Sequence, residues 1–192
     1  MSENWKSGLP VNIGVAVEKF QTAAGDTVGQ LNIRQFTRYT GMQCEELAEK
    51  LALLGSGVDP ASRDLTLFAA QLDEMGKKFK SGVLDSVVPR LMASDGVRAD
   101  IVDADIDLSW VSFGSLNSLG ADVFACVESV AHANLSKIGP DGVVLRDANG
   151  KIQKPEGWTE PDHLPNLYPV PVAGGEPITT DEKARVSQLG GL

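Results

Sequence analysis

Two stretches of the chain combine helical periodicity with a row of acidic residues, and they constrain the fold more than any other feature. They are residues 43–54 (QCEELAEKLALL) and 100–119 (DIVDADIDLSWVSFGSLNSL). Successive residues of a helix turn by about 100°, so Asp103 and Asp107 fall within about 60° of Asp100. By the same count, three acids of the other stretch span roughly 100° of arc: Glu45, Glu46 and Glu49.

Each stretch also carries an apolar stripe beside its acids. The stripes consist of Cys44, Leu47, Ala48 and Leu51 in one stretch, and of Ile101, Ala104, Leu108 and Val111 in the other. Packing one stripe against the other is predicted to bring six carboxylates to one edge of a helix bundle.

Six neighbouring carboxylates repel one another, and bound divalent cations would relieve that repulsion. Mg²⁺ prefers carboxylate oxygens as ligands, so the pattern predicts a magnesium site. The alternative is a pair of solvated helix faces, which is what acids at such spacing form most often. Metal binding is favoured because the acids border the apolar stripes and no basic residue lies among them in the sequence.

Composition limits the class of protein. With 192 residues and 42% apolar residues, the chain is long enough to bury a core. Its 26 acidic and 17 basic residues give a net charge of −9, which argues against nucleic acid as a partner. Cys44 and Cys126 both lie on apolar helix faces, so two free thiols and a reducing, cytoplasmic location are expected. The polar N-terminus does not resemble a secretory leader, and no apolar run predicts a membrane span.

The periodicity along the chain predicts an all-α helical bundle with an irregular C-terminal extension. Helices are expected at 12–24 (capped by Asn12), 33–54 (one helix or two), 62–80, 83–92 (short, interrupted near Pro89), 100–119 and 121–138. Residues 91–97 are expected to be a linker. Residues 1–138 are predicted to form the helical domain and residues 139–192 the extension, with a small hairpin at 141–155 and an extended arm.

A few polar and aromatic residues are candidates for binding a ligand. Asn134 and Lys137 lie one helical turn apart, and Lys154 follows with Arg146 and Lys151, so these side chains could hold a polyphosphate. Trp110 could border a pocket for a flat ring, and Gln21 could bond to a base edge. Each candidate also has a structural alternative. Asn134 could bond to a backbone carbonyl, the cations could form a soluble hairpin surface, and Trp110 could be a core aromatic residue. The sequence has no zinc spacing, Walker loop or GxSxG motif.

Over residues 13–160 the sequence resembles the MazG-like all-α nucleoside triphosphate pyrophosphohydrolases. That family pairs an EExxE helix with a later ExxD helix, and here CEELAEKL and DIVDADIDLSWVSFGSLNSLG correspond to them. The following run, VESVAHANLSKIGPDGVVLRDANGKIQKPEGW, resembles a subgroup common in phages and bacteria. The chain departs from the family in two ways: Asp100 replaces the usual Glu of ExxD, and the gap between the motifs is longer.

The resemblance implies an enzyme that releases a nucleoside monophosphate and pyrophosphate from a (d)NTP, with dGTP or GTP as the expected substrate in a phage 2-aminoadenine pathway. It implies two or three Mg²⁺ per site (Mn²⁺ as a substitute), a homo-oligomer (a dimer or a dimer of dimers) and, for a phage protein, the host cytoplasm. Neither a nucleic acid nor a membrane is expected as a partner. The expected metal ligands are Glu46, Glu49, Asp100 and Asp103, and the expected catalytic carboxylates are Glu45 and Glu46. The expected substrate-binding residues are Gln21, Asp107, Trp110, Asn134, Lys137 and Lys154. A non-catalytic nucleotide- or metal-binding protein, or a helical assembly module, is the alternative.

Overall fold

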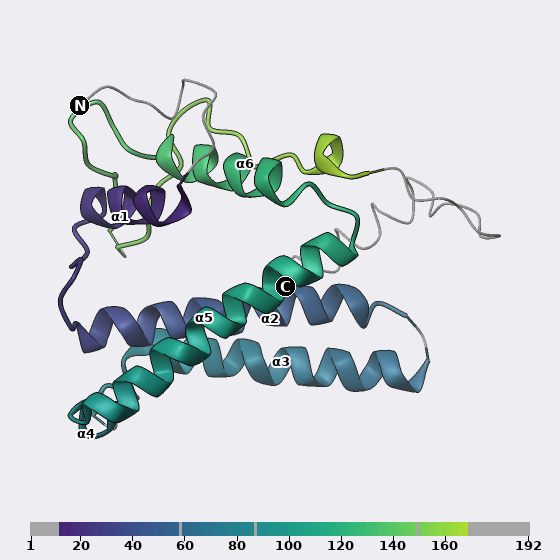
Figure 1. The fold of residues 1–192 in the computed structure, drawn as a ribbon, viewed down its shortest axis with the longest axis horizontal. Helices are drawn as coiled ribbons and strands as arrows, with labels where there is room; N and C mark the ends of the chain where they lie inside the picture. The colour runs from purple at the N-terminus through teal and green to yellow at the C-terminus, as the bar shows by residue number, and fades with distance from the viewer. Residues whose placement is uncertain (1–11, 58, 87, 149, 169–192) are drawn as a thin grey trace. The chain divides into compact units, whose positions relative to one another are not determined.

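The predicted all-α class is confirmed. The structure is a computed structural model that describes residues 12–57, 59–86, 88–148 and 150–168. These residues form six α-helices and one short 3-10 helix, and no strand occurs among them (Figure 1). The helices are α1 (Ile13–Ala23), α2 (Ile33–Leu54), α3 (Pro60–Ser81), α4 (Val88–Met92), α5 (Asp95–Ser118), α6 (Val123–Leu135) and η2 (Leu164–Asn166). Among the described residues, 32–99 form one compact unit, and 12–31 with 100–168 form the other.

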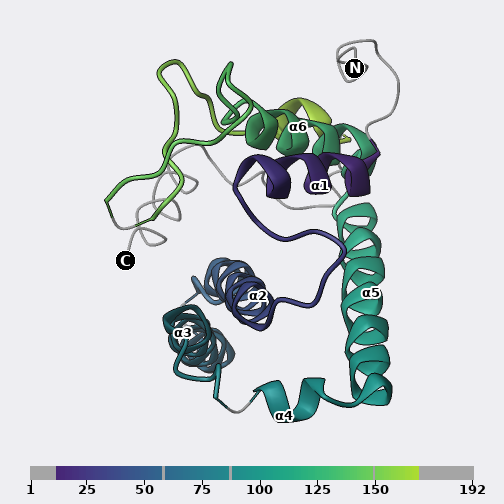
Figure 2. The same cartoon turned by 90° about the vertical axis from the view of Figure 1, so that its left-hand side faces the viewer.

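In the unit of residues 32–99, α2 and α3 lie side by side, as the end-on view in Figure 2 shows. The Asn32 side chain caps α2 by accepting a hydrogen bond from the backbone N–H of Gln35 at 3.0 Å. From there α2 runs as one helix of 22 residues. Asp59 caps α3, and Gly82 ends it at a φ of +83°, a conformation that glycine adopts without strain.

Small residues let the backbones of α2 and α3 approach closely. A Cβ atom at Gly41 would lie 2.7 Å from the carbonyl oxygen of Gly76, and one at Gly76 would lie 2.8 Å from that of Gly41. Ala48 of α2 and Ala69 of α3 are also buried. The α2 stripe that was predicted to face residues 100–119 is therefore partly used here, since Cys44 would be in contact with a Cβ atom at Gly76.

A polar network fastens the end of α3 to the start of α2. Arg34 donates to the backbone carbonyl oxygens of Phe79 and Lys80, carbonyls of the kind that a helix end leaves unpaired. The guanidinium also lies 3.7 Å from a carboxylate oxygen of Asp85. The hydroxyl of Thr37, which is fully buried, donates to the same carboxylate at 2.8 Å.

In the other unit, α1 packs against α6 (Figures 1 and 2). The predicted cap of α1 is confirmed, because the Asn12 side chain accepts from the backbone N–H of Val15 at 3.2 Å. The core between the helices consists of Ala16, Ala131 and Leu135, with Phe20 and Ile138 packed against it. On α6, Cys126 is buried, as expected of a residue on an apolar helix face, whereas Phe124 is 81% exposed.

The segment after α6 pairs with itself and with α1. The predicted hairpin is reduced to one antiparallel bridge, between Arg146 and Ile152, without strands among the described residues. Arg146 donates to the carbonyl oxygens of Gly150 and Ala24 at 2.7 and 2.8 Å. Its guanidinium therefore connects the turn of this segment to the end of α1. Further on, Leu167 forms a bridge with Ala121. The predicted arm therefore lies partly on the chain's own surface, and its residues 169–192 fall outside the described residues.

The helix that carries the second acidic row is longer than predicted. α5 begins at Asp95, inside the stretch predicted to be a linker, and Asp95 places a carboxylate in its first turn. The short helix before it begins at Val88, and Pro89 lies in its first turn, where proline is tolerated. None of the described helices combines the length and the apolar character that a membrane span requires.

Candidate functional site

The three glutamates of the EExxE motif lie along α2, and their surroundings differ. Glu45 is partly buried and pairs with Lys80 of α3, whose ammonium group lies 2.7 Å from the carboxylate. The expectation that these acids lack a cationic partner is therefore wrong for Glu45. The close contact of α2 with α3 explains the pair, because it brings the last turn of α3 beside Glu45.

Glu46 and Glu49 are exposed and have no such partner among the interactions of the described residues. Nearby protein atoms partly desolvate the Glu46 carboxyl and raise its pKa, and the negative charges of Glu49 and Glu45 raise the pKa further. Desolvation, with a smaller contribution from Glu45, likewise raises the pKa of the Cys44 thiol. Cys44 and Cys126 are both free thiols, as predicted.

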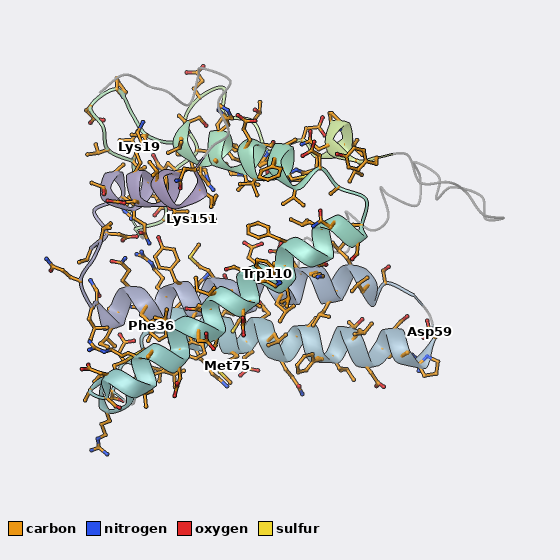
Figure 3. All side chains as sticks on the ribbon, viewed as in Figure 1. Lys19, Phe36, Asp59, Met75, Trp110 and Lys151 are labelled. Atoms are coloured by element: carbon orange, nitrogen blue, oxygen red, sulfur yellow. The ribbon has the colours of Figure 1, made fainter. Side chains whose placement is uncertain are left out.

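The acids of the second row, Asp100, Asp103 and Asp107, are all exposed on α5. Trp110, which was predicted to border a pocket, is 78% exposed on the same helix (Figure 3). The two acidic rows belong to different units, so their convergence stays a prediction. Within the part of the chain that the structure describes, no three Asp, Glu, His or Cys side chains form a group able to hold a metal ion.

Three of the five predicted phosphate-binding side chains, Asn134, Lys137 and Lys154, come together at the end of α6. The Lys137 ammonium donates to the side-chain oxygen of Asn134 at 2.9 Å and lies 5.2 Å from the centre of the Trp158 ring. The Lys154 ammonium lies 4.1 Å from the centre of the same ring and 3.1 Å from a carboxylate oxygen of Glu160. Of the other candidates, Gln21 is partly buried on α1.

Burial and charge both act on this cationic group. Lys137 is partly buried, and desolvation lowers the pKa of its ammonium group. The nearby positive charge of Lys154 lowers that pKa further.

The sequence analysis did not find three residues of these clusters: Lys80, Trp158 and Glu160. Lys80 is far from Glu45 in the sequence, so no local sequence pattern predicts that the two residues pair. Trp158 could have been found, because a tryptophan in the polar run KPEGW needs a surface to cover its ring and a partner for its N–H group. Both needs are met, since the ring contacts two lysines and the indole N–H donates to the carbonyl oxygen of Ala133 at 2.7 Å.

Comparison with known proteins finds a similar solved structure but no matching sequence family. No family model and no curated protein sequence matches the chain. Among solved structures, the chain is similar to the crystal structure of "a putative NTP pyrophosphohydrolase" from Exiguobacterium sp. 255-15. The match has a TM-score of 0.51 and 25% sequence identity, and it covers 80% of this chain and 90% of that chain. The all-α architecture is therefore one that the chain shares with that crystal structure.

Proposed function

We propose that this chain is a divalent-metal-dependent nucleoside triphosphate pyrophosphohydrolase. The observation that carries the proposal is the similarity to the Exiguobacterium protein over 80% of the chain, together with the EExxE and DxxD rows in the family's order. In the reaction, a water oxygen bonds to phosphorus and the bridging oxygen of the anhydride leaves with the other fragment. The products are a nucleoside monophosphate, pyrophosphate and one proton.

The proposed metal ligands are Glu46 and Glu49 from α2 and Asp100 and Asp103 from α5. The donor set fits Mg²⁺ or Mn²⁺, because every ligand supplies carboxylate oxygens and because Glu46 and Glu49 repel each other without a cation. Two or three bound ions would neutralise phosphate charge and lower the pKa of a bound water. Asp100 is one methylene shorter than glutamate, so it reaches less far from its helix.

Glu46 is the better candidate for the carboxylate that accepts the proton of the attacking water. The two glutamates at the start of the motif were equal candidates from the sequence. Glu45 is held by Lys80 at 2.7 Å, and this pair would have to break before Glu45 could take up a proton. Glu46 has no such pair and is exposed to solvent.

The remaining predicted residues would bind the nucleotide. Asn134, Lys137 and Lys154 would contact the phosphates, because their polar groups gather at the end of α6. Three further residues would contact the base or sugar: Gln21, Asp107 and Trp110. The exposed Trp110 ring offers a stacking surface for a base.

We further propose a guanine nucleotide as substrate, with dGTP converted to dGMP. The support is that, within the family it resembles, the chain looks most like the small phage enzyme MazZ, which carries out this reaction in phages that replace adenine with 2-aminoadenine. The same resemblance supports a homo-oligomer, a dimer or a dimer of dimers. A panel of dNTPs and NTPs tests the base preference, and light scattering of the purified chain tests the assembly.

Amide substitutions of the proposed ligands test the activity. Glu49→Gln and Asp103→Asn keep the size of each side chain but remove the charge, and each is expected to lower pyrophosphate release at least about 100-fold because the metals lose a ligand. Asp64→Asn is the matched control, since Asp64 is an exposed carboxylate on α3 outside both rows. Full activity in both ligand variants would contradict the proposal.

The alternative, a non-catalytic binding or assembly protein, makes the opposite prediction. It expects no pyrophosphate from any nucleotide in the presence of Mg²⁺ or Mn²⁺. An assembly module would also show no shift of the melting temperature when metal is added. A non-catalytic metal-binding protein would show the shift but release no pyrophosphate.

A further inference from the structure

We propose that Trp158 is a positioning residue that holds Lys137 and Lys154 together as a subsite for the pyrophosphate part of a triphosphate. The substrate in this inference rests on the proposed function. The role of Trp158 goes beyond it, since Trp158 belongs neither to an acidic row nor to the predicted pair of Asn134 and Lys137.

A hydrogen bond holds the indole ring in place, and both lysines lie close to the ring. Its N–H group donates to the carbonyl oxygen of Ala133, inside the last turn of α6, and thereby attaches the segment after the predicted hairpin to the helix. The Lys137 and Lys154 ammonium groups lie 5.2 and 4.1 Å from the ring centre. Both distances are within the roughly 6 Å over which a ring attracts a cation.

Two positive charges gathered on one ring are unfavourable unless an anion joins them. The ring attracts each ammonium group but does not remove their mutual repulsion, which acts on Lys137. Asn134 accepts a hydrogen bond from Lys137 and carries no charge. Pyrophosphate carries several negative charges and oxygen acceptors, so it can bond to both ammonium groups at once.

In the free protein, the carboxylate of Glu160 takes the place of an anion beside Lys154. Its carboxylate lies 3.1 Å from the Lys154 ammonium, and both side chains are well exposed, so the pair is weak and can be exchanged. An incoming phosphate oxygen would replace the carboxylate on Lys154. The carboxylate therefore competes with the ligand, and its removal should strengthen anion binding.

Calorimetric titration of the full chain with inorganic pyrophosphate, in the presence of EDTA, tests the subsite without metal and without turnover. Trp158→Leu and Lys154→Met are each expected to weaken binding about fivefold, because the first removes both cation–ring contacts and the second removes a cation. Trp158→Phe keeps the aromatic face and is expected to stay within about twofold of the wild type, while Glu160→Gln is expected to bind about two- to fivefold more tightly.

Lys19→Met is the control for net charge, because Lys19 is an exposed lysine on α1 in the same unit (Figure 3), and it is expected to bind as the wild type does. Circular dichroism shows whether Trp158→Leu is folded, and Glu160→Gln keeps the inference testable if it is not. The inference is overturned if the wild type does not bind pyrophosphate, if folded Trp158→Leu binds as the wild type does, or if Glu160→Gln binds more weakly.

Steady-state kinetics separate this inference from the proposed function. A subsite used in binding raises KM for the triphosphate in Trp158→Leu and leaves kcat nearly unchanged, and Trp158→Phe restores KM. If the wild type binds pyrophosphate through Trp158 but hydrolyses no triphosphate, the proposed function fails and the subsite stands. If the enzyme is active and Trp158→Leu changes neither KM nor pyrophosphate binding, the subsite fails and the function stands.

Discussion

Gly76→Ala tests the packing that brings Lys80 to the acidic row of α2. The added Cβ would lie 2.8 Å from the carbonyl oxygen of Gly41 and 2.9 Å from Cγ of Glu45. The first of these atoms is backbone and cannot rotate away, so the two helices must separate. Overpacking of this kind costs about 1–3 kcal/mol, and the better helix propensity of alanine returns about 1 kcal/mol. We therefore expect a net loss of about 1 kcal/mol in the free energy of unfolding.

The assay is urea unfolding followed by circular dichroism at 222 nm, with a thermal scan in which 1 kcal/mol corresponds to about 2–4 °C. Gly114→Ala on α5 is the matched control, because no atom of the described residues, apart from its chain neighbours and its own helix backbone, lies within 4 Å of the added Cβ. It removes the same glycine cost from a helix interior and is expected to raise stability by up to about 1 kcal/mol. Equal gains in both variants would refute the close backbone contact between α2 and α3.

Two further changes test the ends of these helices. Thr37→Val removes the buried hydroxyl that donates to Asp85, and it is expected to lower the free energy of unfolding by about 1–2 kcal/mol in urea titrations; an unchanged midpoint would contradict the network. Hydrogen bonds from the Ser62 hydroxyl and backbone N–H lower the pKa of the Asp59 carboxyl. Because the folded pKa is the lower one, this stabilisation is present above the unfolded pKa and is lost as the pH falls through the folded value. Asp59→Asn should therefore be less stable than the wild type at pH 7 and equally stable once the pH is below both pKa values; a difference that persists in acid would show that charge is not the cause.

The sequence predicted the elements whose signals are local. Asn12 precedes an apolar periodic run, and it caps α1 where the pattern placed the cap. The end of the predicted helix 62–80 was also nearly right, since α3 ends at Ser81 and Gly82 follows with the positive φ that closes a helix. The start of α5 was placed too late, at Asp100, since residues 95–99 carry no apolar stripe.

Partners across space could not be predicted from the same signals. The stripe with Cys44 and Ala48 is equally suited to any apolar helix face, and only the matching glycines of α2 and α3 select α3. The same reasoning failed for Glu45, whose partner Lys80 lies 35 residues away. At the other cluster, Asn134 and Lys137 were found because they are one turn apart, whereas Trp158 reaches them only through the fold.

The most direct test of the central claim is ³¹P NMR of dGTP incubated with the purified chain and Mg²⁺. The account predicts that the triphosphate signals are replaced by those of a nucleoside monophosphate and pyrophosphate in equal amounts, and that EDTA stops the reaction. Release of orthophosphate instead of pyrophosphate, or unchanged spectra for every dNTP and NTP with either Mg²⁺ or Mn²⁺, would contradict it.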